Sequence, residues 1–395
     1  MSDTNWFNLI KTDAQTGARL GRLKTPHGEV LTPVFMPVGS QATVKGVTPQ
    51  QLGDIGIKMI LCNNYHLYLR PGVETVQKMG GLHRFMHWDG AILTDSGGFQ
   101  IFSLARLREI DSEGVKFRSH IDGSEHFITP ELATQYQEAL GADVIMALDI
   151  CPSHQEGELK VREAMDITHR WALRCLKAHR RPDQALFGII QGGFNPKWRL
   201  ESVNALTAMG FAGYAVGGLS LGEPKEQTRQ IVQLTCPALP ENKARYLMGV
   251  GSPEDILFGV ECGVDMFDCV LPTRVARNGA VFSPAGRLNI RNARWKEEPG
   301  PLDAGCSCYL CRNFSAAYLH HLFRAEELLG YTLATLHNLT FLHNFMHKIR
   351  EAIAANDFEA FKADFLGGYQ TTDENIRLAQ KQKWLENRQS LDKPG

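Results

Sequence analysis

VDMFDCVLPTRVARNG, at residues 264–279, joins the end of an apolar segment to a carboxylate and two arginines. The apolar part contains Val264, Met266 and Phe267, and Asp268 stands where it breaks. Proline cannot donate a hydrogen bond to a sheet, so a strand has to end before Pro272. Taken alone, the pattern fits either a reactive carboxylate at a strand end or an edge strand followed by a solvated loop.

The charged residues that follow this carboxylate, as far as Lys296, are all basic. Between Pro272 and Lys296 there are six basic residues and no acidic one, namely Arg274, Arg277, Arg287, Arg291, Arg294 and Lys296. A carboxylate beside such a stretch suits covalent chemistry on a polyanion. The whole chain has a net charge of only −1, so any affinity for nucleic acid has to be local.

Composition places the chain among ordinary globular proteins. It has 395 residues, of which 43% are hydrophobic and 22% charged, enough for a barrel-sized domain with an addition or for two domains. No apolar run reaches membrane-spanning length, and the start MSDTNWFNLIKTD lacks a signal-peptide pattern. We therefore expect a cytoplasmic protein that does not bind membranes. The nine cysteines are odd in number and six are scattered, which argues against a disulfide framework.

Short apolar runs recur along the chain and are nearly continuous rather than alternating, as in parallel strands buried on both faces. They lie at residues 34–38, 57–62, 91–94, 143–148, 185–190, 214–218, 245–250 and 264–268. Helix-start signals lie between them, with a capping side chain before a proline at Thr48, Thr129, Asn195 and Ser252. Eight strands alternating with helices predict a (β/α)₈ TIM barrel of the α/β class. The alternative is a doubly wound open sheet, but no GxGxxG motif follows the first strand.

Two stretches interrupt this alternation. Residues 115–128 predict a hairpin with Asp122-Gly123 at its turn, and residues 278 to about 312 form an insertion after the eighth strand. Helices are expected after it, at 313–329, 332–355 and near 357–366. We thus expect a barrel over 1–277, an inserted zinc-binding subdomain with C-terminal helices over 278–370, and a polar, frayed tail over 371–395.

Polar residues and glycines gather where the apolar runs end, and in a barrel these ends form one face. They are Thr94-Asp95-Ser96-Gly97-Gly98-Phe99-Gln100, then Asp149 and Cys151, Gln191-Gly192-Gly193, Gly217-Gly218-Leu219, Met248-Gly249 and Asp268. Asp95 and Asp268 form the carboxylate pair that a double displacement at an anomeric carbon requires.

Four of these residues suit a flat heterocycle. Asp149 and Gln191 can bind its polar edge, and Phe99 and Met248 can lie on its two faces. Each also has an ordinary explanation. Phe99 and Met248 would be core residues, Asp149 a helix N-cap, and Gln191 a core amide with satisfied hydrogen bonds.

A cysteine cluster predicts a metal site. Cys306, Cys308 and Cys311 place three thiols within six residues, and an imidazole would complete a tetrahedral zinc shell without an open position. The expected cofactor is therefore one structural Zn²⁺ per chain. Spacing alone leaves the fourth ligand open among His337, His320, His321 and His343.

Together these motifs resemble the bacterial tRNA-guanine transglycosylases over roughly residues 8 to 370. The resemblance rests on TDSGGFQ at 94–100, FGIIQGG at 187–193, YAVGGL at 214–219, RYLMGVG at 245–251, MFDCVLPTRVARNG at 266–279 and the Cys/His cluster. It implies a barrel with a zinc subdomain, usually a homodimer. It also implies a pentosyltransferase of queuosine biosynthesis that exchanges guanine at wobble position 34 for preQ1. The implied substrates are the tRNAs with a GUN anticodon, those for Asp, Asn, His and Tyr.

The resemblance also implies roles for single residues. Asp268 matches the nucleophile, which forms a covalent glycosyl-enzyme, and Asp95 the general acid/base. Base-binding positions correspond to Asp95, Ser96, Gly97, Gly98, Phe99, Asp149, Cys151, Gln191, Gly218, Leu219 and Met248. Stretches that contact tRNA correspond to Gly249, Val250, Gly251, Ser252, Pro253, Glu254 and Asp255, and to Thr273, Arg274, Val275, Ala276 and Arg277. The implied zinc ligands are Cys306, Cys308, Cys311 and His337.

Two positions depart from the family pattern. Ile150 stands where the bacterial members carry Glu, which is linked to a peptide flip near Leu219 when the bound base changes; Glu223 is retained. Leu221 replaces the usual Val, which narrows the pocket. If no other group replaces the missing Glu, we expect the preference between guanine and preQ1 to differ from that of relatives that carry it. Two other functions stay open: an RNA-binding zinc protein without chemistry, and a glycosidase of small carbohydrates or nucleosides. The presence of both Asp95 and Asp268 argues against the first, and the basic run against the second.

Overall fold

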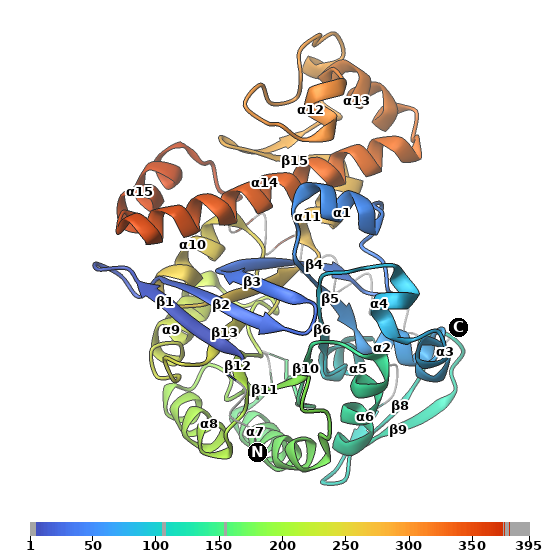
Figure 1. Ribbon diagram of the computed structural model, residues 1–395, viewed down its shortest axis with the longest axis vertical. Coiled ribbons are helices and arrows are strands. Elements are labelled where there is room, and N and C mark those ends of the chain that lie inside the picture. The colour runs from blue at the N-terminus through green and yellow to red at the C-terminus, as the bar shows by residue number, and fades with distance from the viewer. Residues whose placement is uncertain (1–4, 105–107, 154–155, 374, 376–378, 380–395) are drawn as a thin grey trace.

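Eight parallel strands close into a barrel in the computed structural model, which describes residues 5–104, 108–153, 156–373, 375 and 379 (Figure 1). In order around the barrel the strands are β4 (Val34–Gly39), β5 (Met59–Asn63), β6 (Ala91–Asp95), β10 (Val144–Met146), β11 (Ala185–Ile190), β12 (Gly213–Val216), β13 (Ala244–Leu247) and β14 (Met266–Cys269). Each overlaps one of the predicted apolar runs, with ends that differ by up to three residues. The TIM barrel is confirmed, and the doubly wound sheet is wrong.

A three-stranded antiparallel sheet covers the barrel end at which the strands begin. It consists of β1 (Phe7–Thr12), β2 (Arg19–Thr25) and β3 (Gly28–Thr32). Phe7, Leu23 and Val30 are buried in one cluster with inward-facing barrel residues such as Met36 and Leu93. Sequence analysis missed this sheet because its strands alternate buried and exposed residues and contain no apolar run.

The capping signals placed the helix starts correctly. The Thr48, Thr129 and Asn195 side chains accept hydrogen bonds from the first turns of α1 (Pro49–Ile55), α6 (Pro130–Leu140) and α8 (Pro196–Met209). Ser252 precedes α10 (Pro253–Glu261) but makes no such bond; its hydroxyl instead donates to Asp255 at 2.5 Å. The other barrel helices are α2 (Asn64–Leu69), α3 (Val73–Lys78), α4 (Gly81–Met86), α5 (Gly98–Leu104), α7 (Glu158–Ala178) and α9 (Lys225–Thr235).

Residues 115–128 form two antiparallel strands, β8 (Val115–Arg118) and β9 (Glu125–Ile128), on either side of the Asp122-Gly123 turn. A third strand, β7 (Arg108–Ile110), pairs with β8 and widens the hairpin into a small sheet. This sheet contacts the barrel through α2, because the Tyr68 hydroxyl lies 2.7 Å from Nδ1 of His126.

The segment after β14 begins with a helix rather than a solvated loop. This helix, α11 (Leu271–Arg277), has Pro272 in its first turn, where the missing N–H costs nothing. The hairpin of β15 (Ala280–Ser283) and β16 (Gly286–Asn289), the 3₁₀ turn η1 (Ala293–Trp295) and the short helix α12 (Tyr309–Asn313) follow.

Three more helices follow: α13 (Ala316–Arg324), α14 (Leu328–Ala355) and α15 (Phe358–Gly368). Figure 1 shows α14 running along the barrel with α12 and α13 on its far side. Buried Asn338 on α14 joins these parts, because it accepts from the Phe282 amide at 2.9 Å and donates to the Pro272 carbonyl at 3.0 Å. The predicted helix 313–329 is too long, because Glu326 adopts φ 57° and separates α13 from α14. Most of the predicted tail 371–395 lies outside the described residues.

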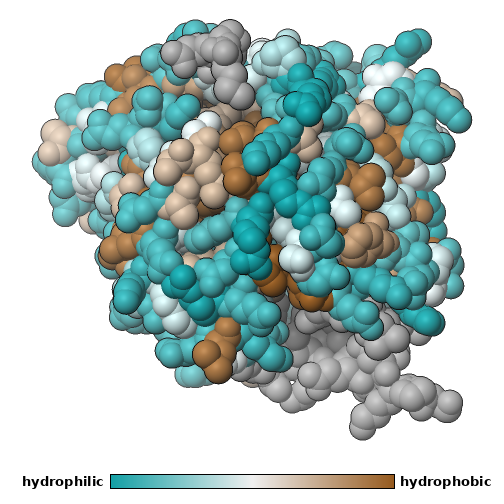
Figure 2. Space-filling view, turned by 90° about the horizontal axis from the view of Figure 1, so that it is seen from below, coloured by the Kyte–Doolittle hydropathy of each residue, from teal (hydrophilic) through white to brown (hydrophobic). Residues whose placement is uncertain are grey.

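Among the described residues, no helix is long and apolar enough to cross a membrane. Figure 2 shows the side on which α6, α7 and α8 lie. Hydrophilic residues cover most of its visible face, and the hydrophobic patches between them are small and separate. Solvent-facing helices around a barrel have this pattern.

Candidate active site

Asp268 lies on β14, close to the end of the strand, and is half-buried. Its Oδ1 accepts a 2.5 Å hydrogen bond from the Tyr246 hydroxyl and a 2.8 Å bond from the Gly249 amide. Burial raises the pKa of Asp268, and these two hydrogen bonds act in the opposite direction by stabilising the carboxylate. The sequence predicted Asp268 and Gly249 but not Tyr246.

Asp95 is the last residue of β6 and is buried. Its Oδ1 accepts from the Asn64 amide at 3.0 Å, and its Oδ2 accepts from the side chains of Gln100, at 2.7 Å, and Asn63. Burial, helped by the negative charge of Asp268, raises the pKa of Asp95 to about 7 despite these donors. A group with that pKa is populated in both protonation states near neutral pH, which suits a proton shuttle.

Asp149, Gln191 and Ser96 are joined by hydrogen bonds although they follow three different strands. Asp149 Oδ1 accepts from the Ser96 hydroxyl at 3.0 Å, and its Oδ2 accepts from Gln191 Nε2 at 2.8 Å. All three are buried, and burial raises the pKa of Asp149. Gln191 Oε1 is a buried acceptor with no hydrogen-bond partner within the described part of the chain. An unpaired acceptor beside a carboxylate is what a ligand edge with N–H donors would satisfy.

Two glycines allow the backbone to approach this group. A Cβ at Gly218 would lie 2.5 Å from Gln191 Oε1, and a Cβ at Gly98 would lie 2.5 Å from the Asp149 carbonyl. Gly218 also has φ 71°, which side-chain-bearing residues rarely adopt. Neither position can carry a side chain without displacing Asp149 or Gln191.

A buried arginine that the sequence analysis did not name holds the loops around this group. Arg199 on α8 is fully buried and donates to the carbonyls of Ile190 and Gly217, each at 2.9 Å, and of Gly193 at 2.7 Å. It therefore connects the ends of β11 and β12. Burial lowers the pKa of Arg199 to about 10, so it still carries a charge at neutral pH. An arginine inside a helix gives no sequence signal for this role.

Glu223 anchors the loop after β12. The buried carboxylate accepts from the amides of Leu221, at 2.8 Å, Gly222, at 3.0 Å, and Ser220. Ser220 adopts φ 61°, so the backbone here is held in an uncommon conformation. Ile150 is also buried, and its amide donates to the Thr168 hydroxyl at 3.0 Å.

The two expected stacking residues differ in environment. The Phe99 side chain, on α5, is 45% exposed, so it is not a core residue as the ordinary explanation required. Met248 is half-buried and packs against the barrel interior. Cys151 and Leu219 are buried, and Gly97 has φ 85° at the turn into α5.

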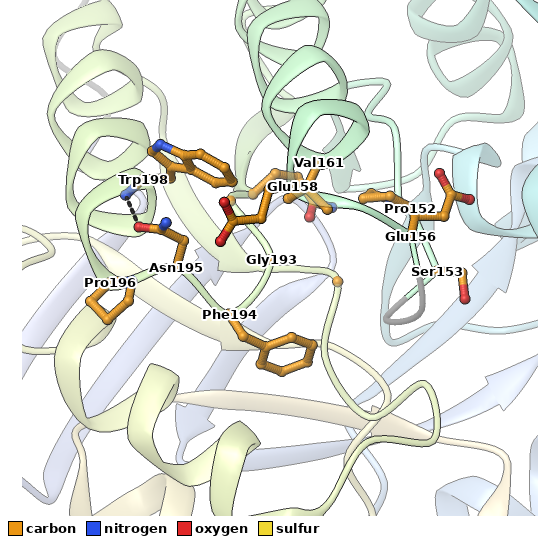
Figure 3. A pocket seen from close by; sticks show the side chains of 13 residues that line it. Pro152, Ser153, Glu156, Glu158, Val161, Gly193, Phe194, Asn195, Pro196 and Trp198 are labelled. Carbon is orange, nitrogen blue, oxygen red and sulfur yellow. Dashed lines mark hydrogen bonds between the residues drawn. The ribbon is translucent and has the colours of Figure 1, made fainter.

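A cavity of about 350 Å³ adjoins this buried polar group, with Gln191 and Gly218 in its wall. Figure 3 shows its lining to come from the loop before α7, including Pro152 and Ser153, and from the loop before α8, including Phe194. Its volume lies in the lower part of the range of small-molecule sites.

The two stretches expected to contact RNA are only partly accessible. In the first, Gly249 is exposed and Ser252 and Asp255 are partly so, while Val250, Gly251, Pro253 and Glu254 are buried. In the second, Arg274 is exposed and Val275 and Arg277 are half-buried, while Thr273 and Ala276 are buried. Buried members of these stretches can shape the surface but cannot reach a ligand with their side chains.

Comparison with known proteins places this site in a family. A sequence model described as queuine tRNA-ribosyltransferase matches residues 13–371. The chain belongs to the queuine tRNA-ribosyltransferase family. It is 61% identical over 379 residues to a protein of that name from Dehalococcoides mccartyi strain BAV1, covering 96% of this chain and 97% of the relative. Relatives of the same name from Halothermothrix orenii and Moorella thermoacetica are each 56% identical over 92% of this chain and 97% of their own length. The expected family is thus confirmed, and with it an enzyme of the tRNA-guanine transglycosylase class, a pentosyltransferase.

This family member also contains the predicted metal-binding cluster. Potential ligand atoms of Cys306, Cys308, Cys311 and His337 all lie within 4.8 Å of one another. His337 Nε2 lies 2.8 Å from the Phe282 carbonyl, so this nitrogen carries the proton and Nδ1 presents its lone pair to the thiols at 3.5–3.7 Å. His320 instead contacts the Ile290 carbonyl at 2.8 Å. The group can bind a metal ion, and His337 is the histidine that lies in it.

Proposed function

We propose that this enzyme exchanges guanine at wobble position 34 of tRNAs with a GUN anticodon for preQ1 in queuosine biosynthesis. These are the tRNAs for Asp, Asn, His and Tyr. The observation that carries the proposal is the pair of carboxylates at the strand ends, Asp268 and Asp95, in different electrostatic environments. Two carboxylates with separate roles are what a double displacement at C1′ of a ribose needs.

In the first half of the reaction, Asp268 attacks C1′ of nucleotide 34. The electron pair of the C1′–N9 bond passes to guanine, which leaves as the neutral base after taking a proton from Asp95. A covalent glycosyl-aspartyl intermediate between enzyme and RNA results. Both hydrogen bonds to Asp268 end on Oδ1, and no described residue donates to Oδ2, so Oδ2 is the attacking oxygen.

In the second half, Asp95 accepts the proton that preQ1 loses as its ring nitrogen attacks C1′. The C1′–O bond to Asp268 breaks, and its electron pair returns to the carboxylate. The two half-reactions use Asp95 first as acid and then as base, in agreement with a pKa of about 7.

Base recognition follows from the buried group of Asp149, Gln191 and Ser96. Asp149 accepts N–H donors of the base edge, and Gln191 Oε1 accepts a further one. Gly218 and Leu219 bring backbone groups to the same edge, and Phe99 and Met248 lie on the two faces of the base.

The loop after β12 sets the preference between guanine and preQ1. Glu223 accepts from the amides of the loop, whereas Ile150 provides no acceptor side chain there. A peptide flip near Leu219 would therefore lack a carboxylate at position 150 to compensate for it. This supports the expectation that the base preference differs from that of relatives with Glu at this position.

We assign the Cys/His cluster to one structural Zn²⁺. Three thiolates and one imidazole are a typical zinc donor set and leave no open coordination position. The ion would fix α12 to α14 and thereby shape the surface next to α11. The exposed Arg274 on α11 would bind tRNA phosphates there.

We further propose that the enzyme is a homodimer. Tyr309, Phe314, Tyr318 and His321 form a series of ring contacts with centroids 5.3–6.5 Å apart. Tyr309 is 52% exposed, and Leu328 on α14 is 77% exposed. Partly exposed aromatic groups of this kind are typical of protein interfaces.

Exchange of labelled guanine into unmodified tRNA tests the function. We expect incorporation into a transcript with a GUN anticodon and none when guanosine 34 is replaced by adenosine. Asp268→Asn is the matched control, because it keeps the shape and should bind tRNA while forming no denaturant-resistant complex on a gel. Binding of tRNA without exchange by the wild type would favour the non-catalytic function, and cleavage of free nucleosides would favour the glycosidase.

A further inference from the structure

A second group of metal-ligating side chains lies at the opposite end of the barrel from the active site. His27 is in the turn between β2 and β3, His83 is on α4, and Asp143 directly precedes β10, whereas Asp149 follows that strand. Potential ligand atoms of the three residues lie within 4.8 Å of one another. His27 Nδ1 is 2.7 Å from Asp143 Oδ1, and His83 Nε2 is 3.2 Å from Asp143 Oδ2.

This group is built into the protein rather than assembled from mobile surface side chains. The exposed fraction of the side chain is 0% for Asp143, 13% for His83 and 37% for His27. The Ile92 amide donates a 2.8 Å hydrogen bond to Asp143 Oδ2 and fixes the carboxylate. Backbone donors of this kind orient the ligands of metal sites.

The two imidazole rings stack, with centroids 3.4 Å apart and planes inclined by 12°. The stacking brings one nitrogen of each ring to the same buried carboxylate, that of Asp143. A neutral imidazole beside a buried carboxylate is a pair of ligands for a transition-metal ion.

One nitrogen of His83 lies between two acceptor oxygens. Its Nε2 lies 3.1 Å from the Gly90 carbonyl and 3.2 Å from Asp143 Oδ2, and both of these are acceptors. One N–H cannot point well at both. A cation could bind the nitrogen and both oxygens together with His27 Nδ1. Ligand atoms about 2.0–2.2 Å from a tetrahedral ion lie roughly 3.3–3.6 Å apart. The two contacts of His83 would therefore open by up to about half an ångström, and the 2.7 Å contact between His27 and Asp143 by roughly 0.6–0.9 Å. One imidazole would also turn out of the stack, so that the lone pairs of both rings point at the ion.

We propose that His27, His83 and Asp143, with the Gly90 carbonyl, bind one divalent transition-metal ion of the zinc type. The ion is additional to the one at the cysteine cluster. It ties the β2–β3 turn to the start of β10 and so holds the N-terminal sheet over the end of the barrel. The site takes no part in the transfer reaction.

Zinc titration of the full-length protein, carrying its metal at the cysteine cluster, tests this. By isothermal titration calorimetry we expect the wild type to bind one further Zn²⁺ per chain. His27→Gln lies in a partly exposed turn and should leave the fold intact while weakening this binding at least about ten-fold. Asp143→Asn should abolish it. His347→Gln removes an exposed histidine that pairs with Glu351 at 3.3 Å and should change nothing.

Co²⁺ identifies the ligands independently. Co²⁺ bound at the additional site should show visible d–d bands without the near-ultraviolet charge-transfer band that thiolate ligands produce. Three results would overturn the proposal. They are no uptake beyond the ion of the cysteine cluster, equal affinity of wild type and His27→Gln, and loss of the additional ion in His347→Gln. Any of these results would mean that His27, His83 and Asp143 only form hydrogen bonds with one another and bind no metal.

Discussion

The hydroxyl of Tyr246 and the amide of Gly249 both donate to the same carboxylate oxygen, Oδ1 of Asp268, at 2.5 and 2.8 Å. Tyr246 is on β13 and Asp268 on the neighbouring β14, so barrel pairing itself brings phenol and carboxylate together. Tyr246 is fully buried and has little freedom to move. The two bonds hold the carboxylate in one orientation, which in the proposed mechanism would direct Oδ2 toward the substrate.

Tyr246→Phe should therefore slow formation of the covalent intermediate without weakening base binding. A hydrogen bond to a charged group contributes about 1.5–3 kcal/mol, which corresponds to a roughly ten- to hundred-fold slower reaction. The phenol lowers the pKa of Asp268, so its loss should also move the acid limb of the rate profile to higher pH. Single-turnover kinetics over a pH series measures both effects. Tyr214→Phe, a buried tyrosine on β12, is the control, and an equal loss there would point to general destabilisation.

The barrel could be predicted because its strands are buried on both faces and therefore appear as continuous apolar runs, such as ALFGII in β11. The N-terminal sheet could not, since only one of its faces is covered and Phe7 alternates with exposed residues. Helix starts were accurate where a capping side chain precedes proline. The predicted end of α13 was inaccurate, because the helix ends before Glu326, which has a positive φ. A glutamate in the sequence gives no indication of a positive φ.

Residues of the candidate site could be predicted from the sequence where they lie at strand ends. Asp95, Asp149 and Gln191 interrupt apolar runs and are conspicuous there. Tyr246 lies inside such a run and Arg199 inside a helix, where both look like ordinary members of their elements. Their roles depend on contacts between elements that only the fold creates.

Arg199→Met should enlarge and loosen the base pocket. The change leaves the carbonyls of Ile190, Gly193 and Gly217 without their buried donor, and each unsatisfied group costs about 1–3 kcal/mol. We expect a lower free energy of unfolding together with a higher KM for preQ1, measured by urea denaturation and by steady-state kinetics. Arg170→Met, an exposed position on α7, serves as the control. A stable variant with an unchanged KM would show that Arg199 does not position the pocket.

Cys308→Ala should lower metal content and thermal stability together. Cys308 is buried and is both a member of the cluster and the N-cap of α12, whose Cys311 amide lies 3.4 Å from its sulfur. Loss of one of four ligands opens the shell, and binding of a structural metal is coupled to folding. Elemental analysis and a melting curve on the same sample measure metal content and thermal stability of the variant and of the wild type. Cys236→Ala serves as a control, because this buried cysteine lies away from the cluster. Active wild-type protein without metal would contradict the assignment.

Asp149→Asn should weaken binding of guanine and preQ1. The two Asp149 oxygens already accept from Ser96 and Gln191, and in the variant one of them becomes an amide donor. That donor then faces either the Gln191 amide or an N–H of the base, a mismatch of about 1–3 kcal/mol. Calorimetry should show a roughly ten- to hundred-fold lower affinity. Unchanged preQ1 affinity in a folded variant would count against Asp149 as a base-edge acceptor.

The two half-reactions should respond to pH in opposite directions. Burial raises the pKa of Asp95 to about 7, so below this pH the folded enzyme holds a proton that it can donate, and above it the group is an acceptor. Release of guanine requires the donor, so formation of the covalent intermediate should slow as pH rises through about 7. Attack by preQ1 requires the acceptor, so decay of the intermediate should accelerate over the same range. Rapid-quench measurement of each step in the wild type and in Asp95→Asn tests this, because the variant should lose both dependences near pH 7 while Asp268 remains to form some adduct. If both steps change with pH in the same direction in the wild type, Asp95 cannot be acid in one and base in the other.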